Sequence, residues 1–156
     1  MREILFRGKR KDNDEWVEGY LCRKYFAELP HDRCVIQYET TGNECEWTPK
    51  YMTAEVIPET IGQFTGLTDK NSKKIFEGDY WIDTDDDNLV LVVEFRNGQF
   101  CFVSYGWNGA LMPYGYDETA GGFGECDCEP MTNYYVEQIE IIGNIHDNPE
   151  LLKEMG

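Results

Sequence analysis

Hydrophobic and polar residues alternate along most of this chain, and a repeat of two is typical of strands that bury one face. Near the N-terminus, residues 3–7 (EILFR) and 16–21 (WVEGYL) follow this pattern and are separated by the polar run 11–15 (KDNDE). This arrangement predicts a β-hairpin with Trp16 in its core. Residues 35–38 (VIQY) predict a further strand.

The second half of the chain has a stronger strand pattern. Residues 80–82 (YWI), 89–95 (LVLVVEF) and 99–103 (QFCFV) are short apolar runs separated by polar turns. Asn97-Gly98, between the last two runs, is the dipeptide that a two-residue hairpin turn favours. These segments therefore predict a meander of three consecutive antiparallel strands.

Three further elements complete the prediction. Residues 136–142 are expected to form a last strand, and residues 53–56 a short helix that ends before Pro58. Residues 68–73 (TDKNSK) form a polar turn. Asn71 is the residue of this turn that best tolerates a left-handed backbone.

Together these elements predict a mainly β protein, a β-rich α+β fold with short helical pieces. Residues 1–58 are expected to form a hairpin-based N-terminal β lobe, and residues 59–156 a C-terminal meander or, by analogy, a small SH3-like barrel. Within the second part, residues 104–132 hold six glycines and five aromatic residues without regular spacing. They predict a long insertion loop. A single compact unit remains the alternative to two lobes.

Charge changes the picture of the surface. The 156 residues include 30 acidic and 14 basic ones, for a formal net charge of -16. The sums are -1 over residues 1–50, -6 over 51–100 and -9 over 101–156, and no Lys or Arg occurs between Arg96 and Lys153. Such a surface repels phosphate, so direct binding of nucleic acid is not expected. The 41% hydrophobic content is too high for a disordered acidic chain.

Composition also bears on compartment and metal binding. No run approaches the roughly 20 apolar residues of a membrane span, and charge rather than an apolar signal follows residues 1–6. We therefore expect a cytoplasmic protein without membrane contact and with free thiols. Of its six cysteines only Cys126 and Cys128 are close-set, and no second pair completes a zinc site. We expect no metal and no cofactor.

Four blocks of the sequence form a family pattern. They are residues 1–8 with 16–20 (MREILFRG, WVEGY), 62–71 (GQFTGLTDKN), 75–79 (IFEGD) and 142–151 (IGNIHDNPEL). In this order they resemble the YopX family of phage and prophage proteins.

The resemblance implies a mostly β protein that is encoded by a mobile element, acts in a bacterial host cell, and has no established activity. It transfers no catalytic residue. Gly66, Gly78 and Gly143 occur where a turn or a close backbone approach would need them, so we interpret the blocks as a folding signature. Where the family usually has Gly, this chain has Ser72, and the backbone of that turn is expected to differ.

One stretch has the spacing of a calcium loop. With Asp83 as position 1, Asp85, Asp87 and Glu94 stand at positions 3, 5 and 12. Position 6 is Asn88 instead of Gly, and the flanking segments are predicted strands instead of helices. We interpret the stretch as a solvated hairpin turn, with calcium binding as the alternative.

Catalytic chemistry has little support in the sequence. His146, beside Asp147, would need Ser104 or Cys101 as a nucleophile, and no spacing places them together. His31 lies in a polar loop, and no glycine loop is followed by the Lys that a phosphate site needs. We predict no catalytic residues, so an enzyme, such as a hydrolase, is not the expected function.

The aromatic insertion is the candidate for recognition. Its glycines would present Tyr105, Trp107, Tyr114 and Tyr116 as an adaptable binding surface, and the alternative is that these rings cover an open end of the β structure.

We therefore expect an accessory protein that binds a partner or assembles with itself. One hypothesis is a homo-oligomer in which the near-neutral N-terminal lobe meets the acidic half of a neighbour. Another is a basic host or phage protein as partner, with residues 104–140 as the first place to look. The alternative is an acidic mimic of DNA that inhibits a host nucleic-acid-binding protein.

Overall fold

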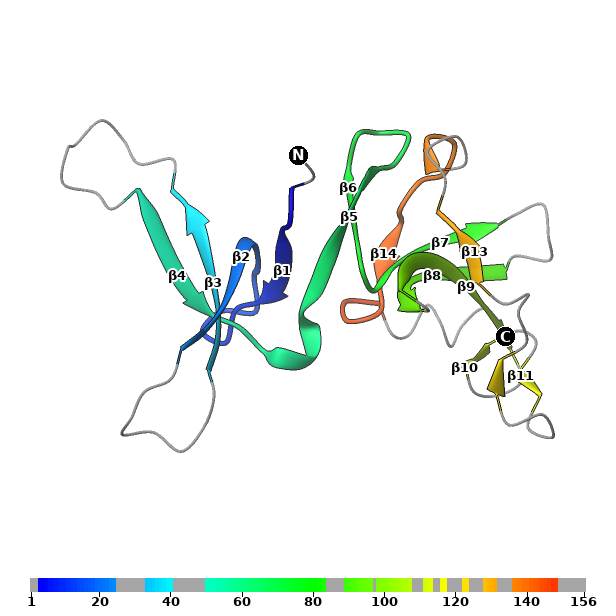
Figure 1. Ribbon diagram of the computed structural model, residues 1–156, viewed down its shortest axis with the longest axis horizontal. Coiled ribbons are helices and arrows are strands. Elements are labelled where there is room, and N and C mark those ends of the chain that lie inside the picture. The colour runs from blue at the N-terminus through cyan, green and yellow to red at the C-terminus, as the bar shows by residue number, and fades with distance from the viewer. Residues whose placement is uncertain are drawn as a thin grey trace. The chain divides into compact units, whose positions relative to one another are not determined.

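The computed structural model shows a chain of two compact units, residues Met1–Phe64 and Thr65–Gly156. The structure describes residues 3–24, 33–40, 50–83, 89–96, 98–107, 111–113, 116–117, 122–123, 128–131 and 136–148. Nearly all of its regular elements are strands, which confirms the mainly β fold class (Figure 1).

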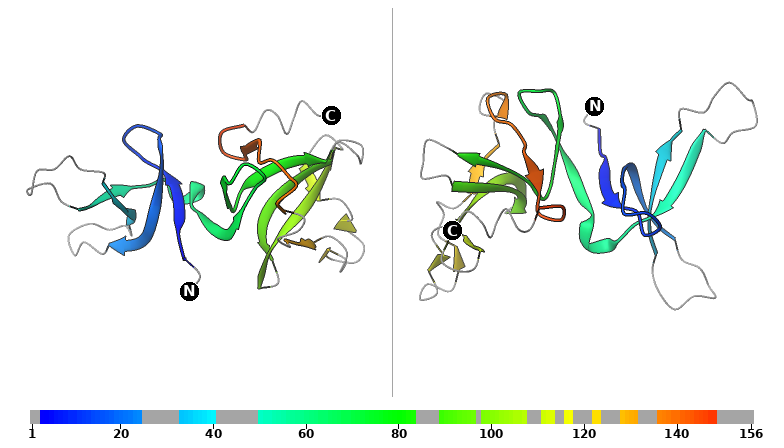
Figure 2. Two further views of the ribbon diagram at one scale, coloured as in Figure 1. Left: turned by 90° about the horizontal axis from the view of Figure 1, so that it is seen from above. Right: turned by 180° about the vertical axis from the view of Figure 1, so that it is seen from behind.

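The first unit is built on an antiparallel sheet. Its strands are β1 (Phe6–Lys9), β2 (Trp16–Lys24), β3 (Arg33–Glu39), β4 (Tyr51–Glu55) and β5 (Gly62–Thr68). The order across the sheet is β4-β3-β2-β1-β5-β6, and β5 carries the chain on into the second unit (Figures 1 and 2). β1 and β2 pair with Lys9 opposite Trp16, which confirms the predicted N-terminal hairpin.

The first sheet curls around its own core. An isolated antiparallel bridge between Arg10 and Val56 joins the end of β1 to the end of β4. The side chains inside the curl are buried and apolar: Val17, Ile36, Ala54 and Val56, with Phe6, Leu21, Cys34, Tyr38 and Ile61 packed against them. Burial of these side chains is what fixes the register, because a shift by one residue would turn them all outward.

Two glycines make the curl sterically possible. A Cβ on Gly19 would lie 2.1 Å from the carbonyl oxygen of Gln37, which is far inside any allowed contact. A Cβ on Gly8 would lie 3.1 Å from the side chain of Val56. Both glycines thus allow backbones to approach more closely than a side chain would permit.

The second unit contains a meander. Before it, β6 (Lys74–Phe76) pairs with β5 in the first sheet, and the meander itself consists of β7 (Asp79–Asp83), β8 (Leu89–Arg96) and β9 (Gln99–Trp107). β7 pairs with β8 and β8 with β9, both antiparallel. Gly98, in the β8–β9 turn, has a φ of 82°. The predicted meander and its tight turn are confirmed.

Short strands follow the meander. They are β10 (Leu111–Pro113), β11 (Tyr116–Asp117), β12 (Gly122–Phe123), β13 (Cys128–Pro130) and β14 (Gly143–Asn144). The second sheet has the order β10-β9-β8-β7-β14, and β13 also pairs with β9. The sheet has open ends at β10 and β14 in the described part of the chain. The small closed barrel that the sequence suggested is therefore not formed.

The meander buries both of its faces. Trp81, Leu91, Val93 and Phe102 point to one side, where they pack with Ile75, Val136, Ile139 and Ile141. Tyr80, Val90 and Val92 point to the other side and pack with Ile82 and Ile145. Because both faces are buried, the sequences of these strands are continuous apolar runs and do not alternate between apolar and polar residues.

Two expectations for secondary structure were wrong. Residues 53–56 do not form a helix, because they belong mostly to β4, and the helical turn that follows is a 3-10 turn over Pro58–Thr60. Residues 136–142 do not form a strand either. Their alternate residues Ile139 and Ile141 are buried in the core, which produces a strand-like pattern without strand pairing, and the paired residues come later, in β14.

The steric constraint at Gly19 leads to a test. Gly19→Ala is expected to lower the free energy of unfolding by about 3 kcal/mol or more, because its methyl group must displace backbone atoms. Gly8→Ala should cost about 1 kcal/mol, because Val56 can shift by the small distance required. Urea denaturation followed by circular dichroism measures both, and equal losses would contradict the steric argument.

Candidate functional site

The central sequence block folds around one carboxylate. Asp69 lies in the turn after β5 and is only 4% exposed. Its Oδ1 accepts hydrogen bonds from the backbone N–H groups of Asn71 (2.8 Å) and Lys73 (3.0 Å). Its Oδ2 accepts a hydrogen bond of 3.1 Å from the N–H of Ile141. A single side chain therefore organises the turn and also fixes the segment that precedes β14.

The surroundings of Asp69 determine its charge. Burial alone would raise the pKa of the carboxyl group, because it removes the charged form from water. The N–H groups of Ile141, Lys73 and Asn71, helped by the charge of Lys73, outweigh burial and hold the pKa below its usual value. Asp69 therefore stays ionised at neutral pH and serves as a hydrogen-bond acceptor.

The same turn contains a strained residue. Ser72 has a φ of 62°, in the left-handed region, and its N–H donates to the carbonyl oxygen of Asp69 at 2.9 Å. The sequence pattern favours the preceding residue, Asn71, for the left-handed position, whereas the structure places it at Ser72. At Ser72 the chain keeps a glycine-like backbone without glycine, at a cost of about 1 kcal/mol. How this backbone compares with that of family members that have Gly here stays a prediction.

The block at residues 75–79 is a second side-chain-closed turn. Asp79 is 1% exposed, and its Oδ2 accepts a hydrogen bond of 2.8 Å from the N–H of Phe76. Gly78 has a φ of 85°. Its N–H donates to the carbonyl oxygen of Val93, and its own carbonyl oxygen accepts from the N–H of Ile145, both at 2.9 Å. The turn thus connects β8 with the C-terminal segment.

The C-terminal block is closed by Asn144. Its Oδ1 accepts hydrogen bonds from the N–H groups of His146 (2.9 Å) and Asp147 (3.0 Å), and its Nδ2 donates to Oδ2 of Asp147 (2.7 Å). Gly143, opposite Tyr80 in the register of β14 and β7, leaves no room for a side chain, because a Cβ would lie 2.9 Å from the Tyr80 hydroxyl oxygen. This block is architectural too.

The N-terminal block places two cations on one ring. The guanidinium carbon of Arg7 lies 4.8 Å, and Nζ of Lys9 lies 5.6 Å, from the centre of the Trp16 ring. Both are within the range of cation–π attraction. Trp16 is half-buried and lies on the opposite face of β2 from the core residue Val17. The expectation that Trp16 packs in the core was wrong.

The candidate calcium ligands are not brought together. Asp83 ends β7 and lies opposite Leu89, at the start of β8, whereas Glu94 lies five residues further along that strand, about 17 Å away. Glu94 Oε2 instead accepts a hydrogen bond of 2.8 Å from Arg96 Nε. Asp85 and Asp87 lie outside the described residues. Within the described ranges, no group of three or more His, Cys, Asp or Glu side chains could hold a metal ion.

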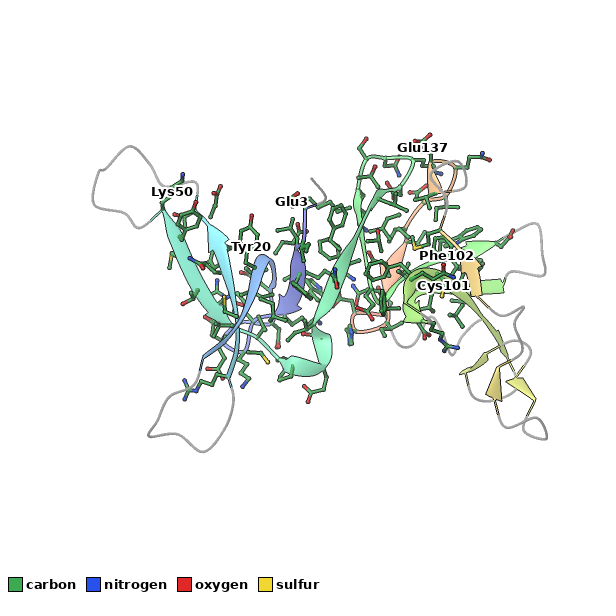
Figure 3. The ribbon with its side chains drawn as sticks, viewed as in Figure 1. Glu3, Tyr20, Lys50, Cys101, Phe102 and Glu137 are labelled. Carbon is green, nitrogen blue, oxygen red and sulfur yellow. The ribbon has the colours of Figure 1, made fainter. Side chains whose placement is uncertain are left out.

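The residues considered for hydrolysis are separated as well. Cys101, which is buried, and Ser104 both lie on β9 (Figure 3). His146 follows β14, at the far edge of the same sheet, and β7 and β8 lie between them in the strand order. Three strand spacings amount to about 14 Å. His31 lies outside the described residues.

The aromatic candidates lie partly on strands. Tyr105 and Trp107 end β9, where they pair with Pro113 and Leu111 of β10. Tyr116 is in β11, opposite Phe123 of β12, and Tyr114 lies outside the described residues. The predicted insertion at residues 104–132 therefore contains strand pairing.

One surface feature was not predicted from the sequence, where a helix was expected over the residues that follow it, 53–56. The edge strand β4 carries two adjacent exposed apolar side chains, Tyr51 (43% exposed) and Met52 (45%). The signal was available in the short run Tyr51-Met52-Thr53, whose residues suit an edge strand better than a helix. Tyr20 on β2 and Lys50 before β4 lie in the same unit (Figure 3).

The structure also bears on membrane contact. Over the described residues there is no helix with the length and apolar character needed to cross a membrane.

Comparison with known proteins gives three findings. The family model described as YopX protein matches residues 5–153. None of the curated proteins compared with the chain matches it. Among solved structures, the crystal structure of protein EF1440 from Enterococcus faecalis is similar with a TM-score of 0.48 and 19% sequence identity, over 97% of this chain and 99% of that one.

The role of Asp69 can be tested by Asp69→Asn. The amide presents an N–H₂ group to at least one of the three backbone donors, so the free energy of unfolding should fall by about 3 kcal/mol. Asp14→Asn is the matched control, because Asp14 is exposed and its φ of 58° suits Asn. It should change stability by less than about 0.5 kcal/mol.

A comparison of the original chain with Asp69→Asn at different pH values gives a further test. The pKa of Asp69 is lower in the folded than in the unfolded chain, so its stabilisation is present above the unfolded-state pKa and is lost as pH falls through the folded-state value. The stability difference between the original chain and Asp69→Asn should therefore shrink in the acidic range. Thermal melting between neutral and strongly acidic pH measures it, and a constant difference would contradict the assigned role.

Proposed function

The chain belongs to the YopX family of phage- and prophage-associated proteins, and on that premise we propose that it is a non-catalytic accessory protein that binds a basic protein through its acidic C-terminal half. The proposal has two supports. The first is that the family blocks serve to build the fold. The second is the distribution of charge along the chain.

The first support concerns what the family blocks do. The carboxylates of Asp69 and Asp79 and the amide of Asn144 all hydrogen-bond to backbone N–H groups of nearby turns. Gly19 and Gly143 occupy positions where a Cβ would meet other atoms below 3.0 Å. Folding alone accounts for side chains with such structural roles, so the blocks carry no evidence for chemistry.

The charge distribution is the observation that carries the proposal. Residues 97–152 contain nine acidic residues and no Lys or Arg. Among the described ones, Glu137 and Asp147 are exposed, and Glu140 forms an exposed ion pair of 2.6 Å with Lys70. A surface region of one sign attracts a partner of the opposite sign and speeds its association.

Aromatic residues in the same region favour a protein partner. Tyr105, Trp107 and Tyr116 belong to strands β9 and β11 in the first part of residues 97–152, just before its acidic residues begin at Asp117, and Tyr114 lies between them in the sequence. Tyr and Trp are enriched among the residues that contribute most to protein–protein binding. Long-range attraction by carboxylates and short-range contact by rings would then act in one place.

A second candidate function has the same electrostatic basis. An acidic domain can occupy the nucleic-acid site of a host protein by presenting carboxylates in place of phosphates. The absence of basic residues over residues 97–152 favours this alternative as well. It differs in requiring that the partner be a nucleic-acid-binding protein and that DNA compete with the chain.

The experiment compares two variants of equal charge change. In the test variant, four acidic residues of the aromatic region are changed to their amides: Asp117, Glu118, Glu125 and Asp127. In the control, four exposed acidic residues of the first unit are changed: Glu3, Asp14, Glu39 and Glu59. The immobilised full chain should retain basic host proteins that elute with rising salt, and the test variant should retain them at least about tenfold more weakly.

Three outcomes are decisive. Equal retention by both variants, or retention of no basic protein, would contradict the proposal. Retained proteins that bind DNA and are released by added duplex DNA would favour the mimic. Retained basic proteins that duplex DNA does not release would favour a partner contact outside any nucleic-acid site.

A further inference from the structure

Among the described residues, the edge strand of the first sheet is paired along only one of its sides for most of its length. β4 (Tyr51–Glu55) is the last strand in the order, and β3 is its described neighbour on one side. The other side of an edge strand presents backbone N–H and C=O groups that a further strand can use.

Two hydrogen bonds establish which residues of β4 direct their backbone groups outward. The N–H of Thr40 donates to the carbonyl oxygen of Lys50 (3.2 Å), and the N–H of Val56 donates to the carbonyl oxygen of Cys34 (3.0 Å). Residues 50 and 56 therefore bond towards β3. Because the direction alternates along an antiparallel strand, residues 51, 53 and 55 direct their backbone groups away from β3.

One of these three positions is already used. The carbonyl oxygen of Glu55 accepts a hydrogen bond of 3.0 Å from the N–H of Lys11, and the Glu55 carboxylate accepts one of 2.7 Å from Lys11 Nζ. That end of β4 is thus covered by the chain itself. Within the part of the chain that the structure describes, Tyr51 and Thr53 remain as the two outward-bonding positions.

Charged side chains protect only the two ends of this edge: Glu55 ends β4, and Lys50 precedes it with Nζ 5.6 Å from the centre of the Tyr51 ring. Residues 51–54 (YMTA) include no charge and no Pro, although both are common devices that prevent edge strands from pairing. Tyr51 and Met52 are 43% and 45% exposed. Exposed apolar side chains thus coincide with unused backbone groups.

We propose that β4 pairs with β4 of a second copy of this chain, antiparallel, about a two-fold axis at Met52. In this register, Tyr51 of each copy lies opposite Thr53 of the other, so all outward positions that the chain leaves open are matched and four backbone hydrogen bonds form. A register centred on Thr53 would instead place Tyr51 opposite Glu55, whose carbonyl oxygen already accepts from Lys11.

The register is also self-complementary in its side chains. The two Met52 side chains lie directly opposite each other on one face of the joined sheets. On the other face the two Tyr51 rings are diagonal neighbours, within reach of each other. The exposed apolar groups of the strand are therefore covered by the same groups of the second copy, as a symmetric interface requires.

Two copies could instead associate head to tail, with the N-terminal lobe of one against the acidic half of the other. Charge distinguishes that contact from pairing at β4 and favours the latter. The first unit, residues 1–64, contains 12 acidic and 9 basic residues and sums to -3 within a chain of -16, so the edge lies in the part of the chain where repulsion between copies is weakest. Added salt weakens an attraction between unlike charges and screens repulsion between like ones. Edge pairing should therefore persist or strengthen with salt, and a head-to-tail contact should weaken.

A charge-swap pair tests the two-fold axis. In Met52→Lys and in Met52→Glu, like charges would meet across the axis, and each variant alone should raise the dimer dissociation constant at least about tenfold. A mixture of the two should recover association as a heterodimer. Sedimentation velocity at high protein concentration measures this, and circular dichroism melting verifies that each variant is folded.

A cross-linking pair tests the register independently. Met52 would form a non-hydrogen-bonded pair with its counterpart, whose Cα atoms lie about 4.5 Å apart, so Met52→Cys should form an intermolecular disulfide on mild oxidation. Thr53→Cys is the control, because each Thr53 lies opposite Tyr51. The peptide linked through residue 52, identified by mass spectrometry, distinguishes this bond from those of the native cysteines.

Several results would overturn the proposal. They are a monomer at every concentration and salt, a dimer that dissociates as salt rises, and a mixture of charge-swap variants that does not associate. Faster cross-linking at residue 53 than at residue 52 would also overturn it, because the axis would then lie elsewhere.

Discussion

The second unit depends on how three backbone N–H groups are satisfied when water is excluded from them. The carboxylate of Asp69 accepts all three, and its bond to Ile141 spans 72 residues of sequence. Each such donor left without a partner would cost about 1–3 kcal/mol. Ile139 and Ile141 pack on the meander beside Ile75, so the carboxylate and the apolar cluster fix the same segment and each requires the other.

The first unit depends on a steric condition. Its sheet curls because Gly8 and Gly19 allow backbone and side chains to come closer than a Cβ would permit. The curl then places Val17 and Val56 in one core and leaves Trp16 on the other face, beneath Arg7 and Lys9. The family blocks thus contain residues that solve local geometric problems, which is why they can recur in a family without indicating a reaction.

The sequence predicted those features that depend on local patterns. The hairpin around residues 11–15 and the meander follow from alternation and from Asn97-Gly98. The prediction of a strand at residues 136–142 was wrong, because alternate burial has two possible causes. A residue can alternate as part of a paired strand, or, like Ile139 and Ile141, by packing against the sheet from outside it. Hydrogen bonds such as that between Asp69 and Ile141 join residues far apart in sequence, so no spacing reveals them. The calcium spacing of Asp83 and Glu94 misled because residues close in sequence are far apart in the structure: pairing of β7 with β8 draws the two ends of the pattern apart.

The edge of β4 shows why exposure and hydrogen bonding must be considered together. Tyr51 and Met52 alone would be two ordinary exposed apolar residues, which most proteins tolerate. Their strand, however, has two outward-bonding positions that no described residue occupies, and Lys11 occupies the third. The number and spacing of those positions restrict a symmetric partner to one register. Interactions of the acidic half, in contrast, depend on summed charge and impose no register. The two surfaces should therefore respond in opposite directions to salt, which separates assembly from partner binding within one chain.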